Sequence, residues 1–197
     1  MSIAYSLPFE GRWFVMQGGD TLNVNHHMKE PSQRYGLDFA KVGGESLRAL
    51  SRIPRPEKAE DFFAWAEPVL SPAAGIVREV ADGLPDNSLG TTDPQNAFGN
   101  YVVIEVEAGE FAFLAHFKNG SLAVKPGDRI AAGQRLGLCG NSGNSTAPHI
   151  HMHVQDTPRR YEGRGRNVVF ERMDVELSGK SFTNVCWPLT RGLFVSS

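Results

Sequence analysis

Residues 101–117, YVVIEVEAGEFAFLAHF, contain two of the clearest strand patterns in the chain. They contain two short runs rich in Val, Ile and Phe, residues 101–107 and 110–117, and the turn-forming pair Ala108 and Gly109 separates them. Runs of this length and composition, divided by a short turn, predict two antiparallel strands joined as a hairpin.

The alternation of side chains along the second run predicts how its histidine is directed. Successive residues of a strand point to opposite faces of the sheet. Phe111, Phe113 and Phe117 are therefore expected on one face, and His116 is expected on the other with Leu114. His116 would then point away from the phenylalanine layer.

The same pattern extends outward from the hairpin. Residues 75–80 and 149–154 are further short β-favouring runs, and 21 glycines and 12 prolines recur along the chain. This combination predicts an all-β protein, built as an antiparallel β-sheet or sandwich.

Two segments depart from the strand pattern. Residues 45–67 carry helix-favouring residues interrupted by Pro54 and Pro56, and we expect two short helices here, inserted at the rim of the sheet. Residues 83–100 are rich in turn formers without periodicity. They predict a long loop that is either functional or disordered.

Composition and charge exclude several classes of protein. The chain has 197 residues, of which 41% are hydrophobic and 21% charged, as expected for one globular domain. A formal net charge of -2 gives no long-range field for nucleic acid. No apolar run approaches the roughly 20 residues that cross a bilayer. Residues 1–13 do not resemble an export signal, so the protein is expected either to stay inside the cell or to have had a signal removed.

The histidines carry the clearest chemical signal. All six fall in three places, residues 26–27, residue 116 and residues 149–153. In the last group His149, His151 and His153 share one face of a strand, and imidazole is a good ligand for zinc. Taken alone, this motif is equally typical of a surface strand whose polar side chains face water.

Asp38 strengthens the metal hypothesis. It lies between apolar residues in GLDFA, residues 36–40, which predicts that the carboxylate is buried. A buried carboxylate needs a partner such as a metal ion. The alternative is that Asp38 is a turn or cap residue. One carboxylate and two imidazoles around a divalent metal leave a coordination position open, as in catalytic zinc sites. His26 and His27 are adjacent in sequence, so only one of them is expected to face the metal.

These residues resemble those of a known family, the lysostaphin-type (LytM-like) zinc metallopeptidases. The resemblance covers about residues 7–154 and loosely the remainder. It rests on NHH (25–27) with QRYGLD (33–38), SPAAGIV (71–77), LAH (114–116), VKPGD (124–128), and GNSGNS (140–145) leading into PHIH (148–151). It implies a fold of the duplicated hybrid motif type, as a single domain 1–197 with a core over 7–156 and a C-terminal extension, 157–197, that packs on the core.

The resemblance also implies roles for individual residues. The metal, Zn2+, would be held by His27, Asp38 and His151, and His116 and His149 would flank the reacting carbonyl. Two departures stand out. Arg34 occupies the position where the family commonly has its first histidine ligand, so His27 would reach the metal through a longer loop, with His26 as the fallback. His153 is an additional histidine that could line the cleft.

The implied function is a zinc-dependent endopeptidase that hydrolyses amide bonds with metal-activated water, in peptidoglycan-type or glycine-rich peptides. The alternative is a catalytically inactive relative that acts as a binding or regulatory module. Residues 124–134, VKPGDRIAAGQ, also look like half of a biotinyl or lipoyl carrier domain, but no suitable attachment lysine lies nearby, and a carrier has no use for clustered histidines. The expected partner is a peptide or cell-wall peptide substrate, with no nucleic acid and no integral membrane segment.

Overall fold

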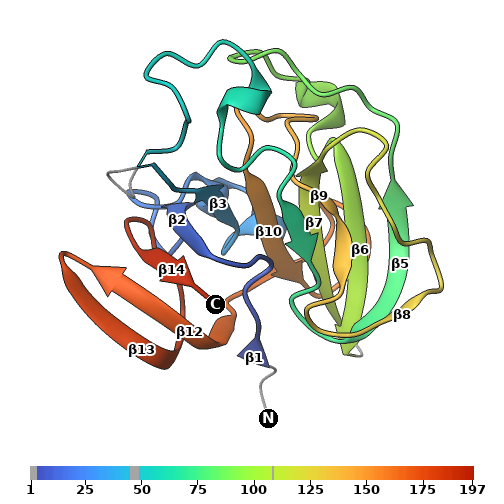
Figure 1. The fold of residues 1–197 in the computed structure, drawn as a ribbon. Helices are drawn as coiled ribbons and strands as arrows, with labels where there is room; N and C mark the ends of the chain where they lie inside the picture. The colour runs from blue at the N-terminus through green and yellow to red at the C-terminus, as the bar shows by residue number, and fades with distance from the viewer. Residues whose placement is uncertain (1–3, 45–48, 108) are drawn as a thin grey trace.

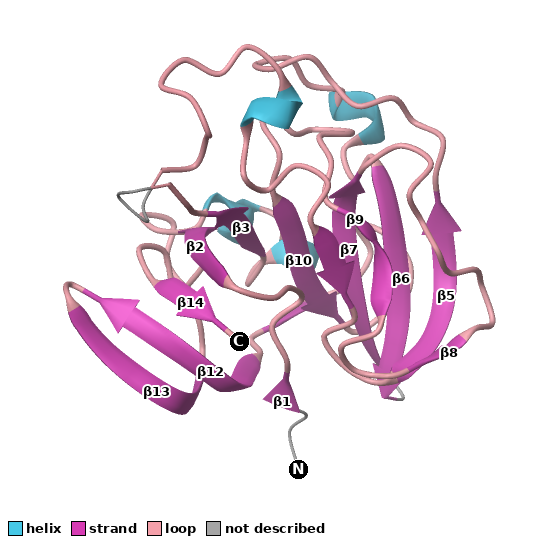
Figure 2. Ribbon diagram, viewed as in Figure 1, coloured by secondary structure: helices cyan, strands magenta, loops and turns pink. Residues whose placement is uncertain are grey.

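A computed structural model describes residues 4–44, 49–107 and 109–197 (Figure 1). Within these ranges, twelve strands form one sheet and two form a second, small one. The helical elements there are short 3-10 turns, which leaves strands and loops to dominate the ribbon (Figure 2). The predicted all-β class is confirmed.

The strands and turns are bounded as follows. The strands are β1 (Ala4–Tyr5), β2 (Arg12–Gln17), β3 (Leu37–Lys41), β4 (Pro68–Leu70), β5 (Gly75–Ala81), β6 (Asn100–Glu107), β7 (Glu110–Phe117), β8 (Arg129–Ile130), β9 (Arg135–Leu138), β10 (Ile150–Gln155), β11 (Gly165–Arg166), β12 (Val169–Leu177), β13 (Lys180–Trp187) and β14 (Phe194–Ser196). The 3-10 turns are η1 (His26–Lys29), η2 (Pro31–Gln33), η3 (Ala59–Asp61) and η4 (Pro94–Asn96). No helix in the described ranges is long and apolar enough to cross a membrane.

The large sheet brings distant parts of the chain together. Its strands run in the order β1-β12-β14-β2-β3-β10-β7-β6-β5-β8, with β11 beside β10 and β13 beside β12. β1 and β12 pair in parallel, and the other pairs among the described strands are antiparallel, as predicted. β10 lies between β3 and β7, which places His151 opposite Asp38 on one side and Ala115 on the other.

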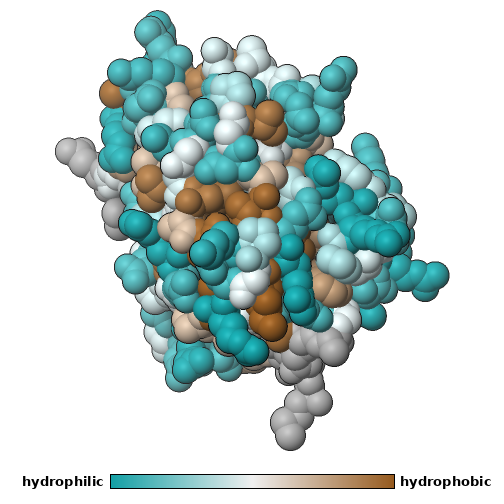
Figure 3. All heavy atoms as spheres, turned by 90° about the vertical axis from the view of Figure 1, so that its right-hand side faces the viewer, coloured by the Kyte–Doolittle hydropathy of each residue, from teal (hydrophilic) through white to brown (hydrophobic). Residues whose placement is uncertain are grey.

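Alternation along β10 separates the core from the polar face. Ile150, Met152 and Val154 belong to the main hydrophobic core, which also contains Phe39 of β3 and Phe170 of β12. The residues between them therefore point to the opposite face of the sheet. Figure 3 shows the surface of the molecule on the side of β5 and β8, where mostly hydrophilic residues surround a central hydrophobic area.

The predicted hairpin is present, with one correction at its end. β6 and β7 pair from Glu107 with Glu110 onward, and Ala108 of the predicted turn lies outside the described residues. The register shifts near the far end, where His116 has a φ of 67°. An extra residue in the left-handed conformation interrupts the alternation of a strand. Phe117 therefore packs in the main core.

The prediction that His116 points away from Phe111 and Phe113 is consequently wrong. These two phenylalanines form a second cluster with Ala115 on the polar face of the sheet. The His116 ring lies on that face as well, 4.7 Å between ring centroids from His149 and 5.9 Å from His151. The bulge has turned the side chain toward the other histidines.

The segment predicted to hold two short helices is mostly irregular. Residues 45–48 lie outside the described residues, and residues 49–67 contain a single 3-10 turn, η3. Pro54 and Pro56 explain the difference, because each lacks an amide donor and each disfavours helical geometry in the residue before it. Two of its residues, Leu50 and Phe62, line the main cleft.

The long loop over residues 83–100 is held by hydrogen bonds to residues 141–145. The backbone N–H of Asp93 donates to the carbonyl of Gly143, and that of Asn144 donates to the carbonyl of Ala97. Phe98 and Ala97 line the main cleft. The loop therefore forms a wall of the cleft.

Candidate active site

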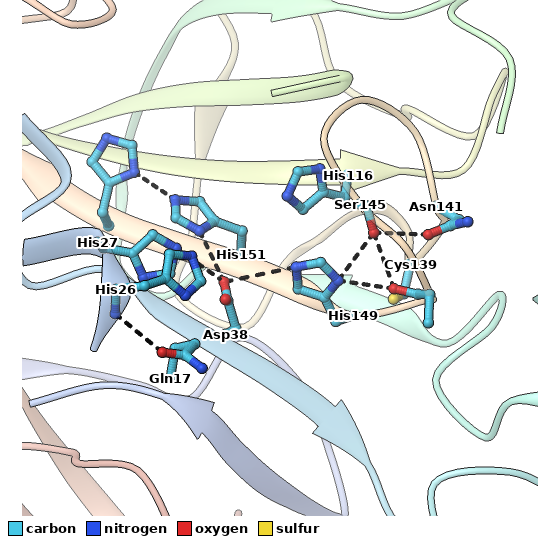
Figure 4. Close-up of polar contacts among 12 residues, drawn as sticks. Gln17, His26, His27, Asp38, His116, Cys139, Asn141, Ser145, His149 and His151 are labelled. Atoms are coloured by element: carbon cyan, nitrogen blue, oxygen red, sulfur yellow. Dashed lines mark hydrogen bonds and ion pairs between the residues drawn. The ribbon is translucent and has the colours of Figure 1, made fainter. Parts of the chain in front are cut away.

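One cleft contains the five residues singled out from the sequence. It has a volume of about 610 Å3, and its lining includes His27, Asp38, His116, His149 and His151. These side chains come from η1, β3, β7, the residue before β10, and β10 itself. Figure 4 shows them directed toward a common centre.

Three imidazole nitrogens converge on a single carboxylate oxygen. Oδ1 of Asp38 lies 3.0 Å from Nδ1 of His151, 3.5 Å from Nε2 of His27 and 3.7 Å from Nε2 of His149. Tetrahedral zinc with bonds of about 2.0–2.1 Å separates its ligand atoms by about 3.3 Å. The first two separations, 3.0 and 3.5 Å, bracket this value.

Local backbone geometry brings His27 and His151 close together. His27 follows Asn25, which caps η1 by accepting a hydrogen bond from the His27 amide. A Cβ at Gly36 would lie 3.0 Å from Cγ of His27 and 3.2 Å from Cε1 of His151. A side chain at position 36 would therefore crowd both rings, whose centroids are 4.7 Å apart.

His26 also lies at the cleft. Its ring centroid is 4.1 Å from that of His27, and donor atoms of His26, His27 and Asp38 all lie within 4.8 Å of one another. His26 is exposed, whereas His27 is buried and approaches Oδ1 of Asp38 directly. Adjacent histidines in a 3-10 turn can thus face the same site, contrary to the expectation from an extended chain.

Burial sets the charge state of the site. Desolvation lowers the pKa of His27 to about 3, although the Asp38 charge opposes the shift. Burial also lowers the pKa of His116 well below its usual value. Burial raises the pKa of the Asp38 carboxyl, but its interactions with His27, His151 and His149, including the hydrogen-bond contact with His151, outweigh this and hold it below its ordinary value. A buried carboxylate among imidazoles suits a bound cation.

Hydrogen bonds to the backbone orient His116 and His149. Nδ1 of His116 lies 2.8 Å from the carbonyl of Ser142, and Nδ1 of His149 lies 2.9 Å from the carbonyl of Ala147. A carbonyl only accepts, so Nδ1 carries the proton in both rings. Each neutral ring therefore has an unprotonated Nε2.

His153 does not line the cleft, contrary to the expectation that it could. Its side chain is buried, with its ring stacked on Phe113 at 4.7 Å between centroids, and it contacts His151 from behind. Gln155 continues the same row of side chains and is also buried. Sequence reasoning missed Gln155 and gave no role to Asn25, although the two-residue spacing 149, 151, 153, 155 was available as a signal.

Comparison with known families assigns the chain to a class. The family model of Peptidase family M23 matches residues 55–163. The chain therefore belongs to this family of metallopeptidases. The matched segment contains His116, His149 and His151, whereas His27 and Asp38 precede it.

Individual relatives agree with this class. The chain is 42% identical over 147 residues to peptidoglycan DD-endopeptidase ShyA of Vibrio cholerae, covering 72% of this chain and 31% of ShyA. It is 30% identical over 142 residues to an "uncharacterized metalloprotease" of Haemophilus influenzae, covering 72% of this chain and 27% of that protein. The chain thus spans between a quarter and a third of the length of these relatives.

A solved structure shares the fold. Pseudoalterin, described as an M23 metalloprotease from the deep sea, superposes with a TM-score of 0.52 at 16% sequence identity. The match covers 97% of this chain and 100% of pseudoalterin. Because the match covers nearly the whole chain, it includes the C-terminal strands.

Proposed function

We propose that this chain is a zinc-dependent endopeptidase that hydrolyses amide bonds in peptidoglycan-type or glycine-rich peptides. The observation that carries the proposal is the convergence of nitrogens from His27, His149 and His151 on Oδ1 of Asp38 inside an open cleft. Membership of a metallopeptidase family supports the chemistry. The name of the ShyA relative, a peptidoglycan DD-endopeptidase, supports the substrate class.

The residues present fit a zinc site. His27, Asp38 and His151 would hold the ion, since two imidazoles and a carboxylate are common zinc ligands and their donor atoms lie at suitable separations. When bound there, zinc would polarise a carbonyl and lower the pKa of water toward neutrality. His149, at 3.7 Å from Oδ1 of Asp38, lies beside this set of ligands.

His116 and His149 would carry the proton transfers. The unprotonated Nε2 of a neutral imidazole can accept a proton from the attacking water, and the resulting N–H can donate to the leaving amine. The two imidazoles lie 4.7 Å apart, so either could accept the proton of the water, and the ring that accepts it gains the Nε2–H that can donate to the developing oxyanion or to the leaving amine. Their hydrogen bonds to Ser142 and Ala147 would hold both rings in place.

We also infer that residues 1–197 act as a single domain, with a core over 7–156 and the extension 157–197 packed on it. The support lies in the sheet and the core. β12 pairs with β1, β14 pairs with β2, and Phe170 and Val195 belong to the main hydrophobic core.

A peptide screen with and without chelator tests the function. The zinc-loaded protein is expected to cleave purified peptidoglycan or oligoglycine, and chelation is expected to abolish cleavage. His116→Ala supplies a matched control that keeps the three candidate ligands. Zinc binding without cleavage of any of these substrates would contradict the endopeptidase proposal and favour the binding module.

A further inference from the structure

We propose that two buried carboxamides, Asn25 and Gln155, are positioning residues that determine which ring nitrogen His27 and His151 present to the metal, with His153 relaying the effect of Gln155. This inference rests on the zinc site proposed above. The hydrogen-bond partners of each histidine ring show which of its two nitrogens carries the proton.

The position of the His151 proton depends first on Gln155. The amide nitrogen of Gln155 donates to two backbone carbonyls, those of Thr157 at 2.7 Å and Arg159 at 2.8 Å. Carbonyls only accept, so this end of the side chain must be the NH2 group, and Oε1 must face His153. Oε1 lies 3.3 Å from Nε2 of His153. His153 therefore carries its proton on Nε2.

The proton position in His153 in turn determines the proton position in His151. A neutral ring protonated on Nε2 has a bare Nδ1, and Nδ1 of His153 lies 2.9 Å from Nε2 of His151. His151 must donate across this contact, so its own proton is on Nε2. Its Nδ1, which lies 3.0 Å from Oδ1 of Asp38, is thereby left to bind a cation.

The relay opposes a competing arrangement. If Nδ1 of His153 did not accept a hydrogen bond, the most stable tautomer of His151 would carry its proton on Nδ1 and donate it to the Asp38 carboxylate. Hydrogen bonds to a charged acceptor are stronger than those between neutral groups. That proton would occupy the nitrogen needed for the metal. The hydrogen bond to His153 shifts the balance toward the tautomer that can bind metal.

Asn25 orients His27 by the same logic. Its Nδ2 donates to the carbonyls of Gly19 at 2.8 Å and Arg34 at 3.4 Å, and its Oδ1 accepts from the amide of His27 at 3.1 Å. The orientation of the amide is therefore determined. Oδ1 lies 2.9 Å from Nδ1 of His27, so Nδ1 donates and Nε2 is bare on the side of Asp38.

Histidine NMR on the metal-free protein tests the tautomers directly. Long-range proton–nitrogen correlations at mildly alkaline pH report which nitrogen carries the proton. We expect Nε2–H on His151 and Nδ1–H on His27 in the wild type, and a shift of the His151 proton to Nδ1 in His153→Phe. A wild-type His151 protonated on Nδ1, or no change in His153→Phe, would overturn the relay.

Zinc affinity gives a second readout, because outer hydrogen-bond partners of zinc-bound histidines typically contribute about 10–100-fold. His153→Phe and Asn25→Ala are expected to weaken zinc binding by roughly this factor. His153→Asn, whose Oδ1 replaces the Nδ1 acceptor, is expected to recover part of the loss. Met152→Leu is the control, since it changes a buried residue of the same strand on the opposite face.

The outcomes separate this inference from the proposed function. Circular dichroism and thermal unfolding establish that each variant is folded before its affinity is compared. Wild-type zinc affinity in folded His153→Phe would refute the relay and leave the endopeptidase proposal intact. The tautomers expected above in a protein that cleaves no peptide would support the relay and refute the endopeptidase.

Discussion

Removal of metal should make the protein sensitive to mild acid. Burial lowers the pKa of His27 to about 3 and those of His116 and His153 well below the usual value. In the unfolded chain these rings regain a pKa near ~6.5. As the pH falls below that value, the unfolded state binds protons that the folded state does not, so the free energy of unfolding decreases.

The size of the effect follows from the pKa shifts. His27 removes up to about 1.4 kcal/mol per pH unit, which amounts to about 2 kcal/mol between pH ~6.5 and ~4.5. A loss of this size is a sizeable part of the roughly 5–15 kcal/mol total stability of a typical domain, and the lowered pKa values of His116 and His153 act in the same direction. Asp38 adds little in this window, because an aspartate in an unfolded chain titrates near ~3.9.

Denaturant titrations with chelator present measure this loss. The free energy of unfolding is obtained at several values between neutral pH and pH ~4.5, for wild type and for His27→Gln. The variant should show a slope shallower by up to about 1.4 kcal/mol per pH unit, whereas Met28→Leu, which changes a neighbouring side chain that does not titrate, should keep the wild-type slope. Stability that is constant or rises as the pH falls through this window would refute the reasoning.

Three further predictions follow from the site and its walls. Asp38→Asn keeps the shape of the side chain but removes its charge, and is expected to lose zinc in a calorimetric titration; full retention would contradict the ligand set. His116→Ala should still bind zinc but hydrolyse peptide about 100-fold more slowly or worse, and an unchanged rate would exclude it as a proton carrier. Gly99→Ala would drive a Cβ into the backbone of Ser142 at a φ of 60°, so thermal unfolding should show a loss of about 2 kcal/mol or more. Gly120→Ala is its control, since Gly120 has a φ of 70° with open space around it, and an equal loss in both variants would disprove the clash.

Four strands, β5, β6, β7 and β10, could be predicted because their signal is local. Residues 75–80 and 110–117 became β5 and β7 within one residue, since alternation and β-branched or aromatic content are properties of the segment itself. β13 was missed as a separate strand, because its Lys, Ser, Thr and Asn are mostly exposed and it pairs only at the edge with β12 among the described strands. Edge strands lack the hydrophobic pattern on which such predictions depend.

The candidate site was less accessible to sequence reasoning, because its geometry depends on pairing between strands. His116 changes face through a bulge that exists only where β6 and β7 lose register. His153 lies behind His151 because Phe113 of the neighbouring strand offers a ring on which it stacks. Neither fact is encoded in the spacing of the histidines themselves.

The place of β10 in the sheet governs when the cleft can exist during synthesis. Asp38 and His151 are 113 residues apart, so β10 can join β3 to β7 only after all the residues between them have been synthesised. Pairings of such long range form slowly and only with the complete partner strands. A nascent or prematurely terminated chain that lacks β10 therefore cannot bring Asp38 and His151 together.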